Sequence, residues 1–206
     1  MPYIELAELG VATVYEAAGR RGLIDVELTQ VVPGTRAAGP ARTVRCGQGD
    51  NLMVHAALAR AQPGDVLVVT MPRPEPVALL GDLLATQAKA RGLAAVLVDA
   101  AVRDVDELVA LGLPIWSRYV RARGAEKGEV GTIDEPVTIG DAIVRAGDVV
   151  VLDADGALVV ERERLSEVLQ AARARSQQEN ATRAELEQGA LTYDLFGLRD
   201  LVEREE

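Results

Sequence analysis

Short, fully apolar runs alternate with segments of helical periodicity in the middle third of the chain, and this alternation constrains the fold most. The runs VLVVTM at 66–71 and LAAVLVDA at 93–100 are predicted to be strands buried on both faces. The segments at 82–92 and 105–112 are predicted to be helices, the first of them closed by Gly92. Strands and helices that alternate in this way form βαβ units with a parallel sheet. The pattern therefore predicts an α/β domain.

The flanking segments add antiparallel strands, a loop and further helices. Gly-Asp and Asp-Gly turns punctuate the segment at 137–160, which is predicted to form three short strands. Three prolines in the segment at 72–80 predict a loop that runs into the next helix. Two further helices are predicted: one in the segment 9–25, whose end is marked by Gly19 and Gly22, and one in the segment 50–65, capped by Asp50 and stopped by Pro63-Gly64-Asp65. Strands are predicted at 41–46 and 113–120.

A long polar helix is predicted from 163 to 189. It has few apolar positions, so it cannot bury a full face on its own domain, and helices of this kind often cross to a neighbouring subunit. We therefore divide the chain into a layered α/β domain with a mixed sheet at 1–160 and a C-terminal helical arm at 161–206. The arm is predicted to contact a neighbouring subunit.

Composition argues against several classes of function. A net charge of −10 disfavours nucleic-acid binding, which needs clustered Lys and Arg. No apolar run approaches the roughly 20 residues that span a bilayer, and the acidic start of the chain does not resemble a secretory signal. The single cysteine, Cys46, cannot form an internal disulfide. We therefore expect a reduced, cytoplasmic protein that binds neither nucleic acid nor membranes.

Two loops at predicted strand ends carry polar residues, and in open α/β sheets ligands bind at the carboxyl ends of parallel strands. The first loop, Gly81-Asp82, begins a helix. The free backbone N–H groups of Leu83 and Leu84 at that helix start favour an anion. If neighbouring strands lead into both loops, this helix start and the polar residues of the second loop converge on one spot.

The second loop places Arg103 beside Asp104 after the strand at 93–99. A 2-oxo acid needs its carboxylate neutralised, which the Arg103 guanidinium and helix amides can do. Its keto oxygen needs a Lewis acid if the adjacent carbon is to become an enolate, and Asp104 and Asp82 are hard oxygen ligands for Mg²⁺ or Mn²⁺. The alternative is an ordinary helix start, with Asp104 as N-cap and Arg103 solvated.

These motifs resemble the class II pyruvate aldolase and RraA-like family, RraA being the regulator of ribonuclease E activity A. The segments GDLLATQAKARG at 81–92, VLVDAAVRDVDEL at 96–108 and LGLPIW at 111–116 are similar to its signature block. Ala100 stands where the family pattern leads us to expect Gly. The resemblance covers nearly the whole chain. It implies a swivelling β/β/α-type fold, assembled as a homotrimer or hexamer with sites at subunit boundaries.

The family's aldolases cleave 4-hydroxy-4-methyl-2-oxoglutarate or 4-carboxy-4-hydroxy-2-oxoadipate to pyruvate with a divalent metal, and also decarboxylate oxaloacetate. The resemblance implies that Asp104 ligates the metal directly, while Asp82 and a neighbouring subunit's Glu179 hold it through water. Arg103 and the helix-start amides would hold the pyruvate carboxylate and enolate. No residue is identified as the general base, for which a metal-associated water is expected. His55, the single histidine, is expected to serve core or surface packing.

Two other functions stay open. The family also contains non-catalytic regulators that bind an RNA-degrading enzyme, although a binding module has no reason to place Asp82 beside an anion-holding helix start. A different metal-dependent 2-oxo acid lyase is the third reading. Substrate walls are expected in the loops at 70–78 and 117–128. The arginines of the loop at 117–128 are expected to be solvated rather than paired with a substrate: Arg118, Arg121 and Arg123.

Overall fold

The computed structural model describes residues 2–203 and is built around one mixed β-sheet. Within these residues, nine strands form the sheet in the order β1-β6-β5-β3-β2-β10-β11, with β4 beside β5 and β7 beside β2. Residue 1 of the predicted domain at 1–160 and residues 204–206 of the predicted arm at 161–206 lie outside the described residues. The strands are β1 (Thr29–Gln30), β2 (Ala37–Arg45), β3 (Val66–Thr70), β4 (Ala78–Leu80), β5 (Ala95–Val102), β6 (Ile115–Val120), β7 (Thr132–Ile133), β10 (Val149–Asp153) and β11 (Gly156–Val160).

The centre of the sheet is parallel and its margins are antiparallel. β2, β3, β5 and β6 pair in parallel in that spatial order, as β4 does with β5. β10 runs antiparallel to β2 and β11, and β1 runs antiparallel to β6. A separate hairpin of β8 (Val137–Ile139) and β9 (Ala142–Val144) packs on one face. The predicted α/β class with a mixed sheet is thereby confirmed.

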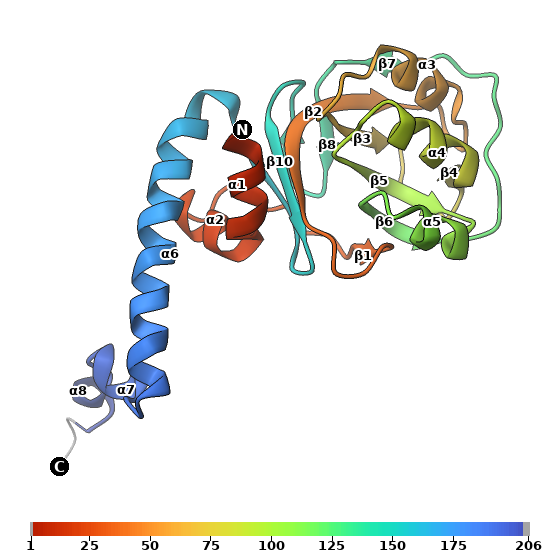
Figure 1. The fold of residues 1–206 in the computed structure, drawn as a ribbon. Coiled ribbons are helices and arrows are strands. Elements are labelled where there is room, and N and C mark those ends of the chain that lie inside the picture. The colour runs from red at the N-terminus through yellow and green to blue at the C-terminus, as the bar shows by residue number, and fades with distance from the viewer. Residues whose placement is uncertain (1, 204–206) are drawn as a thin grey trace.

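Helices lie in two groups on the two sides of this sheet (Figure 1). The first group packs over the parallel strands and comprises α3 (Leu52–Arg60), α4 (Asp82–Ala90) and α5 (Val105–Leu111). The second group packs over β10 and β11 and comprises α1 (Pro2–Leu9), α2 (Val11–Ala17) and the first turns of α6 (Leu165–Glu187), which follows a 3₁₀ turn at Arg162–Arg164. No helix in residues 2–203 is both long and apolar enough to cross a membrane.

The rest of α6 forms the predicted C-terminal arm. The helix has 23 residues, and its buried side chains are confined to Val168, Leu169 and Ala172 near its start. At about 1.5 Å per residue it is roughly 35 Å long. Figure 1 shows it running away from the sheet and ending beside α7 (Thr192–Leu195) and α8 (Arg199–Val202).

The predicted loop at 72–80 is wrong over its last residues, which form strand β4. Val77 to Leu80 are all buried, and Ala78 and Leu80 pair with β5. The prolines occupy only the first part of the segment, so nothing prevents the apolar part from adding to the sheet. This correction matters for the site, because β4 leads directly into Gly81.

Two further predictions differ from the structure. The helix predicted in the segment 9–25 is interrupted at Gly10, whose φ of 84° favours glycine, and α2 ends at Ala17, two residues before the expected stop at Gly19. Close packing also requires this glycine, since a Cβ there would lie 3.0 Å from Oδ2 of Asp153. The segment at 137–160 forms four strands rather than three, because a further turn at 145–148 separates β9 from β10.

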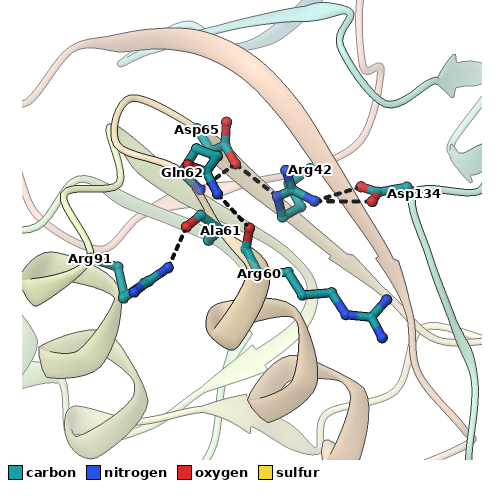
Figure 2. Close-up of polar contacts among 7 residues, drawn as sticks. All are labelled: Arg42, Arg60, Ala61, Gln62, Asp65, Arg91 and Asp134. Carbon is teal, nitrogen blue, oxygen red and sulfur yellow. Dashed lines mark hydrogen bonds and ion pairs between the residues drawn. The ribbon is translucent and has the colours of Figure 1, made fainter.

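A polar network fixes the turn between α3 and β3 (Figure 2). The carboxylate of Asp65, just before β3, accepts hydrogen bonds from the backbone N–H of Gln62 at 2.9 Å and from Nε of Arg42 at 2.8 Å. Nη1 of Arg42 also pairs with the carboxylate of Asp134, the residue that directly follows β7, at 3.0 Å. These bonds hold the turn that follows Arg60, the last residue of α3, and tie it to β2. The helix thus ends just before Pro63-Gly64-Asp65, the stop expected from the sequence.

A buried ion pair joins β5 and β6. The carboxylate of Asp99, only 2% exposed, accepts a hydrogen bond from Nε of Arg118 at 2.6 Å. Burial raises the pKa of Asp99, and Arg118 offsets only part of this effect. The expectation that Arg118 is a solvated loop arginine is therefore wrong, because β6 extends through it and pairs it with a carboxylate of the neighbouring strand.

Replacing Arg118 by Met should lower the free energy of unfolding by about 3–5 kcal/mol, because the buried carboxylate loses its counter-charge. The deficit should shrink as the pH falls below neutral, because loss of Arg118 raises the pKa of the buried Asp99 further than in the native protein, and the folded variant then takes up a proton before the folded native protein or the unfolded chain does. Urea unfolding followed by circular dichroism measures both effects. The double variant Asp99→Leu/Arg118→Met should recover most of the stability. An equal deficit in the double variant would contradict this cause.

Candidate active site

The two predicted loops lie side by side because the strands that lead into them are neighbours. β4 and β5 are parallel and end at the same edge of the sheet. The backbone N–H of Arg103 donates to the carbonyl of Leu80 at 3.1 Å, which joins the two strand ends. Gly81 is the N-cap residue of α4 and Asp82 its first residue. The sheet itself therefore brings Gly81-Asp82 next to Arg103-Asp104.

Asp104 has an unusual backbone and directs its carboxylate away from its own helix. Its φ of 60° and ψ of 44° lie in the left-handed region, which costs a residue other than glycine about 1 kcal/mol or more. It holds the N-cap position of α5, but its side chain makes no capping bond there. Oδ2 instead accepts a hydrogen bond from the backbone N–H of Asp82 at 3.1 Å and lies 3.5 Å from Nε of Arg103. The N-cap alternative therefore does not explain this side chain.

Close packing around Gly81 leaves no room for a side chain. A Cβ at this position would lie 2.5 Å from Oδ2 of Asp104 and 3.1 and 3.2 Å from Cγ and Nε of Arg103. The φ of −142° is accessible to any residue, so space rather than backbone conformation requires glycine here. Gly81 thus permits the contact between the start of α4 and the Arg103-Asp104 pair.

A cavity of about 150 Å³ lies beside this group of residues. All the predicted site residues except Glu179 line it. The N–H group of Asp82 is taken by Asp104, whereas those of Leu83 and Leu84 follow in the first turn of α4, where an α-helix offers no carbonyl acceptor. This wall therefore combines N–H donors, a helix N-terminus and a guanidinium, which together favour an anion.

Glu179 is not part of this cavity within one chain. It lies on α6, where its carboxylate pairs with Nε of Arg175 at 2.7 Å and accepts a hydrogen bond from Oγ1 of Thr13 at 3.3 Å. It lines a hollow of about 420 Å³ on the arm, together with Phe196. The structure of a single chain therefore brings together the loops at 81–84 and 103–104 but leaves Glu179 apart.

Sequence reasoning missed three polar residues on the cavity wall. Asn51 and His55 are four residues apart and so share one face at the start of α3, and Lys127 comes from the loop expected to form a substrate wall. His55 is exposed on this wall, so of the expected core or surface packing the core role does not fit its position. The spacing of four residues between Asn51 and His55, directly after the helix-capping Asp50, was the sequence signal that could have identified this pair.

Asn51 carries an unpaired acceptor. Its side chain is 7% exposed, and Nδ2 donates to the carbonyl of Leu79 at 3.0 Å, which fixes the orientation of the amide. Among the residues that the structure describes, Oδ1 of Asn51 is the buried side-chain atom without a hydrogen-bond partner. A buried acceptor left unpaired in a cavity wall suits a bound donor such as a hydroxyl or water.

The acidic residues of the cavity suit a hard cation. Asp82 and Asp104 both line it, and Mg²⁺ is commonly bound through one or two carboxylates while it keeps several waters. Over residues 2–203 no group of three or more His, Cys, Asp or Glu side chains is placed to hold a metal. Cys46 does not offer a nucleophile, because burial raises the pKa of its thiol to about 12.

A model of one protein family, RraA-like and described as Aldolase/RraA, matches residues 11–159. The chain belongs to this family. A relative named putative 4-hydroxy-4-methyl-2-oxoglutarate aldolase, from Halalkalibacterium halodurans, is 34% identical over 166 residues, which cover 81% of this chain and 77% of that protein.

Solved structures of similar fold carry other names. An uncharacterized protein from Pseudomonas syringae pv. tomato has a TM-score of 0.84 at 25% identity and covers 92% of this chain and 90% of its own. RraAS2 of Streptomyces coelicolor, described as an unusual member of the RNase ES inhibitor RraA protein family, has a TM-score of 0.78 at 32% identity, with 88% and 95% coverage. The family therefore includes both aldolase and inhibitor names, and membership alone does not choose between them.

Replacing Asp104 by Asn should leave the free energy of unfolding within about 1 kcal/mol of the native value, because Asn adopts the left-handed region readily and its Oδ1 still accepts from Asp82. Asp104→Val is the contrasting variant and should lose about 2 kcal/mol, since β-branched residues are rare at positive φ. Urea unfolding measures both. If Asp104→Asn lowered the free energy of unfolding as much as Asp104→Val, the negative charge of Asp104 would itself stabilise the fold. That result would weaken the assignment of this carboxylate as a ligand of a bound cation.

Proposed function

We propose that this protein is a divalent-metal-dependent lyase that cleaves 4-hydroxy-4-methyl-2-oxoglutarate, or 4-carboxy-4-hydroxy-2-oxoadipate, to pyruvate by a retro-aldol reaction. The same site would decarboxylate oxaloacetate. The observation that carries the proposal is the carboxylate of Asp104, which is directed at the start of α4, with Arg103 beside it, in the wall of one cavity. The name of the Halalkalibacterium relative supports the same class of reaction.

Asp104 would hold Mg²⁺ or Mn²⁺ directly, and Asp82 would hold it through water. The two carboxylates line one cavity and fit a cation that keeps part of its hydration shell. When bound, the cation would supply a Lewis acid that polarises the keto oxygen of the substrate.

The chain's own residues would bind the substrate and stabilise the charge that develops. The planar guanidinium of Arg103 would pair with the carboxylate of the 2-oxo acid. The N–H groups of Leu83 and Leu84 would stabilise negative charge on the enolate oxygen as the C–C bond breaks. Oδ1 of Asn51, which is buried and unpaired, would accept a hydrogen bond from the substrate hydroxyl.

Proton transfer completes the reaction. A water held by Asp82 would accept the proton of the substrate hydroxyl and pass one of its own protons to the Asp82 carboxylate, while the electron pair of the broken C–C bond would pass into the pyruvate enolate. Protonation of the enolate carbon then gives pyruvate. With oxaloacetate, CO₂ leaves in place of the carbonyl fragment, and the same enolate is protonated.

A non-catalytic regulator of an RNA-degrading enzyme is the second candidate, and the similarity to Streptomyces coelicolor RraAS2 favours it. Such a role requires a protein surface and no turnover. It gives no reason for Asp104 to adopt a costly backbone conformation and direct its carboxylate at another helix, which is why we place it second.

We also propose that the chain forms a trimer or a pair of trimers in which Glu179 of a neighbouring subunit completes the outer part of the site. The arm extends away from the sheet of its own chain (Figure 1). Beyond α6 it exposes large apolar side chains that a neighbouring subunit would cover: Leu191, Leu195, Phe196, Leu198, Leu201 and Val202.

The native protein should release pyruvate from oxaloacetate with Mg²⁺ or Mn²⁺ above the rate of the metal alone, and EDTA should abolish this release. Asp104→Ala should lose the metal-dependent rate.

Arg103→Ala should lower kcat/KM by about 10²–10³-fold while the protein stays folded, because the lost contact stabilises charge and the side chain is half exposed. A coupled lactate dehydrogenase assay measures the rates. Absence of turnover in the native protein would favour the regulator, and an intact rate in Arg103→Ala would contradict the role of Arg103.

Co-expression of two weak variants tests the shared site. Glu179→Ala and Asp104→Ala each remove one group, but in mixed trimers about a quarter of the sites would combine both native residues from adjacent subunits. The mixture should therefore be more active than either variant alone. The matched control is the double variant Glu179→Ala/Asp104→Ala co-expressed with Asp104→Ala, which can form no complete site. Equal activity in the two mixtures would contradict a shared site.

A further inference from the structure

We propose that Gly124 is a positioning residue for Arg103, because the absence of a side chain at position 124 leaves the guanidinium of Arg103 the room in which it lies. The inference rests on the proposed function, in which that guanidinium holds the carboxylate of a 2-oxo acid. Gly124 lies in the loop between β6 and β7 and does not itself line the cavity beside Asp104. It would act through Arg103 and not by touching the substrate.

Gly124 packs directly on the end of the Arg103 side chain. A Cβ at position 124 would lie 2.8 Å from Nη1 and 3.8 Å from Cζ of Arg103, and the first distance is shorter than real Cβ contacts. Gly81 approaches the same side chain nearer its stem, at Cγ and Nε. Two glycines from different loops thus leave room for one arginine along its length.

Other contacts of the guanidinium are weak. Among residues 2–203 its ion pair is with Asp104, at 3.5 Å, and the two side chains are 49% and 39% exposed. Exposed pairs of this kind contribute about 1 kcal/mol or less, so this one leaves the long side chain considerable freedom. Because no strong contact within the described residues holds the guanidinium in place, a side chain added at position 124 would displace it.

The segment that carries Gly124 is anchored on both sides. Before it, the N–H of Ala78 in β4 donates to the carbonyl of Arg123 at 2.7 Å, and a β-bridge pairs Ala78 with Gly124. After it, the carboxylate of Asp50 accepts hydrogen bonds from the two N–H groups of residues 128–129, at 2.5 and 3.0 Å. A group added at position 124 would therefore displace the guanidinium rather than the loop.

The anchor at Asp50 persists at neutral pH. Burial alone would raise the pKa of its carboxyl, but hydrogen bonds from the N–H groups of Gly128, Leu52 and Glu129 outweigh this effect and lower the pKa below its ordinary value. Its other oxygen accepts from Leu52 at the start of α3 at 2.8 Å, in the capping role expected from the sequence. One carboxylate thus fixes the loop to a helix that lines the cavity.

A methyl group at position 124 should therefore disturb the site and spare the fold. The end of an arginine side chain moves easily, and Gly124 does not have a left-handed backbone, so alanine is conformationally allowed. Recognition of a carboxylate by the guanidinium fork depends on its placement. A misplacement of about 1 Å can reduce the rate on the order of 10²-fold.

Gly124→Ala compared with Gly128→Ala tests the inference. Gly128 belongs to the same loop, is likewise outside the left-handed region, and a Cβ there would have no atom of the described chain within 4 Å. Gly124→Ala should raise KM for oxaloacetate, lower kcat/KM by about 10–100-fold and weaken oxalate binding measured by calorimetry. Its melting temperature should stay within about 2 °C of the native value. Gly128→Ala should match the native protein in all four measurements.

A double-mutant cycle separates positioning from a general structural effect. Added to Arg103→Ala, Gly124→Ala should cause no further loss of kcat/KM or oxalate affinity, because the group that it positions is already gone. A further loss would overturn the positioning role, as would equal activity of Gly124→Ala and Gly128→Ala. If the native protein neither turned over oxaloacetate nor bound oxalate, the proposed function would fail first, and this inference with it.

Discussion

One hydrogen bond joins the two halves of the candidate site, from the backbone N–H of Asp82 to the carboxylate of Asp104. It requires a residue other than glycine to adopt a left-handed backbone, so the carboxylate points across to α4 and not along its own helix. The bond also requires glycine at position 81, because the carboxylate approaches the backbone there more closely than a Cβ would allow. The strained residue and the tight contact thus occur at one place, as is common at functional sites.

The sheet creates the conditions for this bond. β4 has only three residues, yet its parallel pairing with β5 puts the end of one strand beside the end of the other. Both strands are buried throughout, so the loops that follow them are held by a rigid core while their polar side chains reach the surface. An anion-favouring helix start, a guanidinium and two carboxylates can therefore line one cavity of only about 150 Å³.

The parts of the fold that could be predicted from sequence are those with strong periodicity. Buried parallel strands such as β3 and β5 read as continuous apolar runs, and helix α4 is bounded by clear start and stop residues. β4 was missed because three residues are too few to show a period and prolines precede them. Arg118 was misread because its pairing with Asp99 depends on the register of β5 and β6, which no local pattern records.

The residues of the candidate site likewise fall into those that sequence identified and those that it did not. The loops at 81–84 and 103–104 were identified by their polar residues, and their convergence was expected if neighbouring strands led into both; β4, the strand that meets this condition, was itself missed. Asn51 and Lys127 come from elements that tertiary packing alone brings to the cavity, and the contact of Gly124 with Arg103 depends on a loop anchored by a carboxylate more than 70 residues away, Asp50. Local patterns do not identify Lys127 or Gly124, whereas for Asn51 the four-residue spacing to His55 is a local signal.

A crystal structure with Mn²⁺ and oxalate, recorded at a wavelength that gives an anomalous signal for manganese, tests the central claim most directly. Oxalate resembles the enolate of pyruvate in charge and shape, and manganese binds the same oxygen ligands as magnesium. The account predicts an anomalous peak about 2.0–2.3 Å from the carboxylate of Asp104, with oxalate contacting Arg103 and the N–H groups at the start of α4. Manganese elsewhere, or oxalate bound away from Arg103, would contradict it.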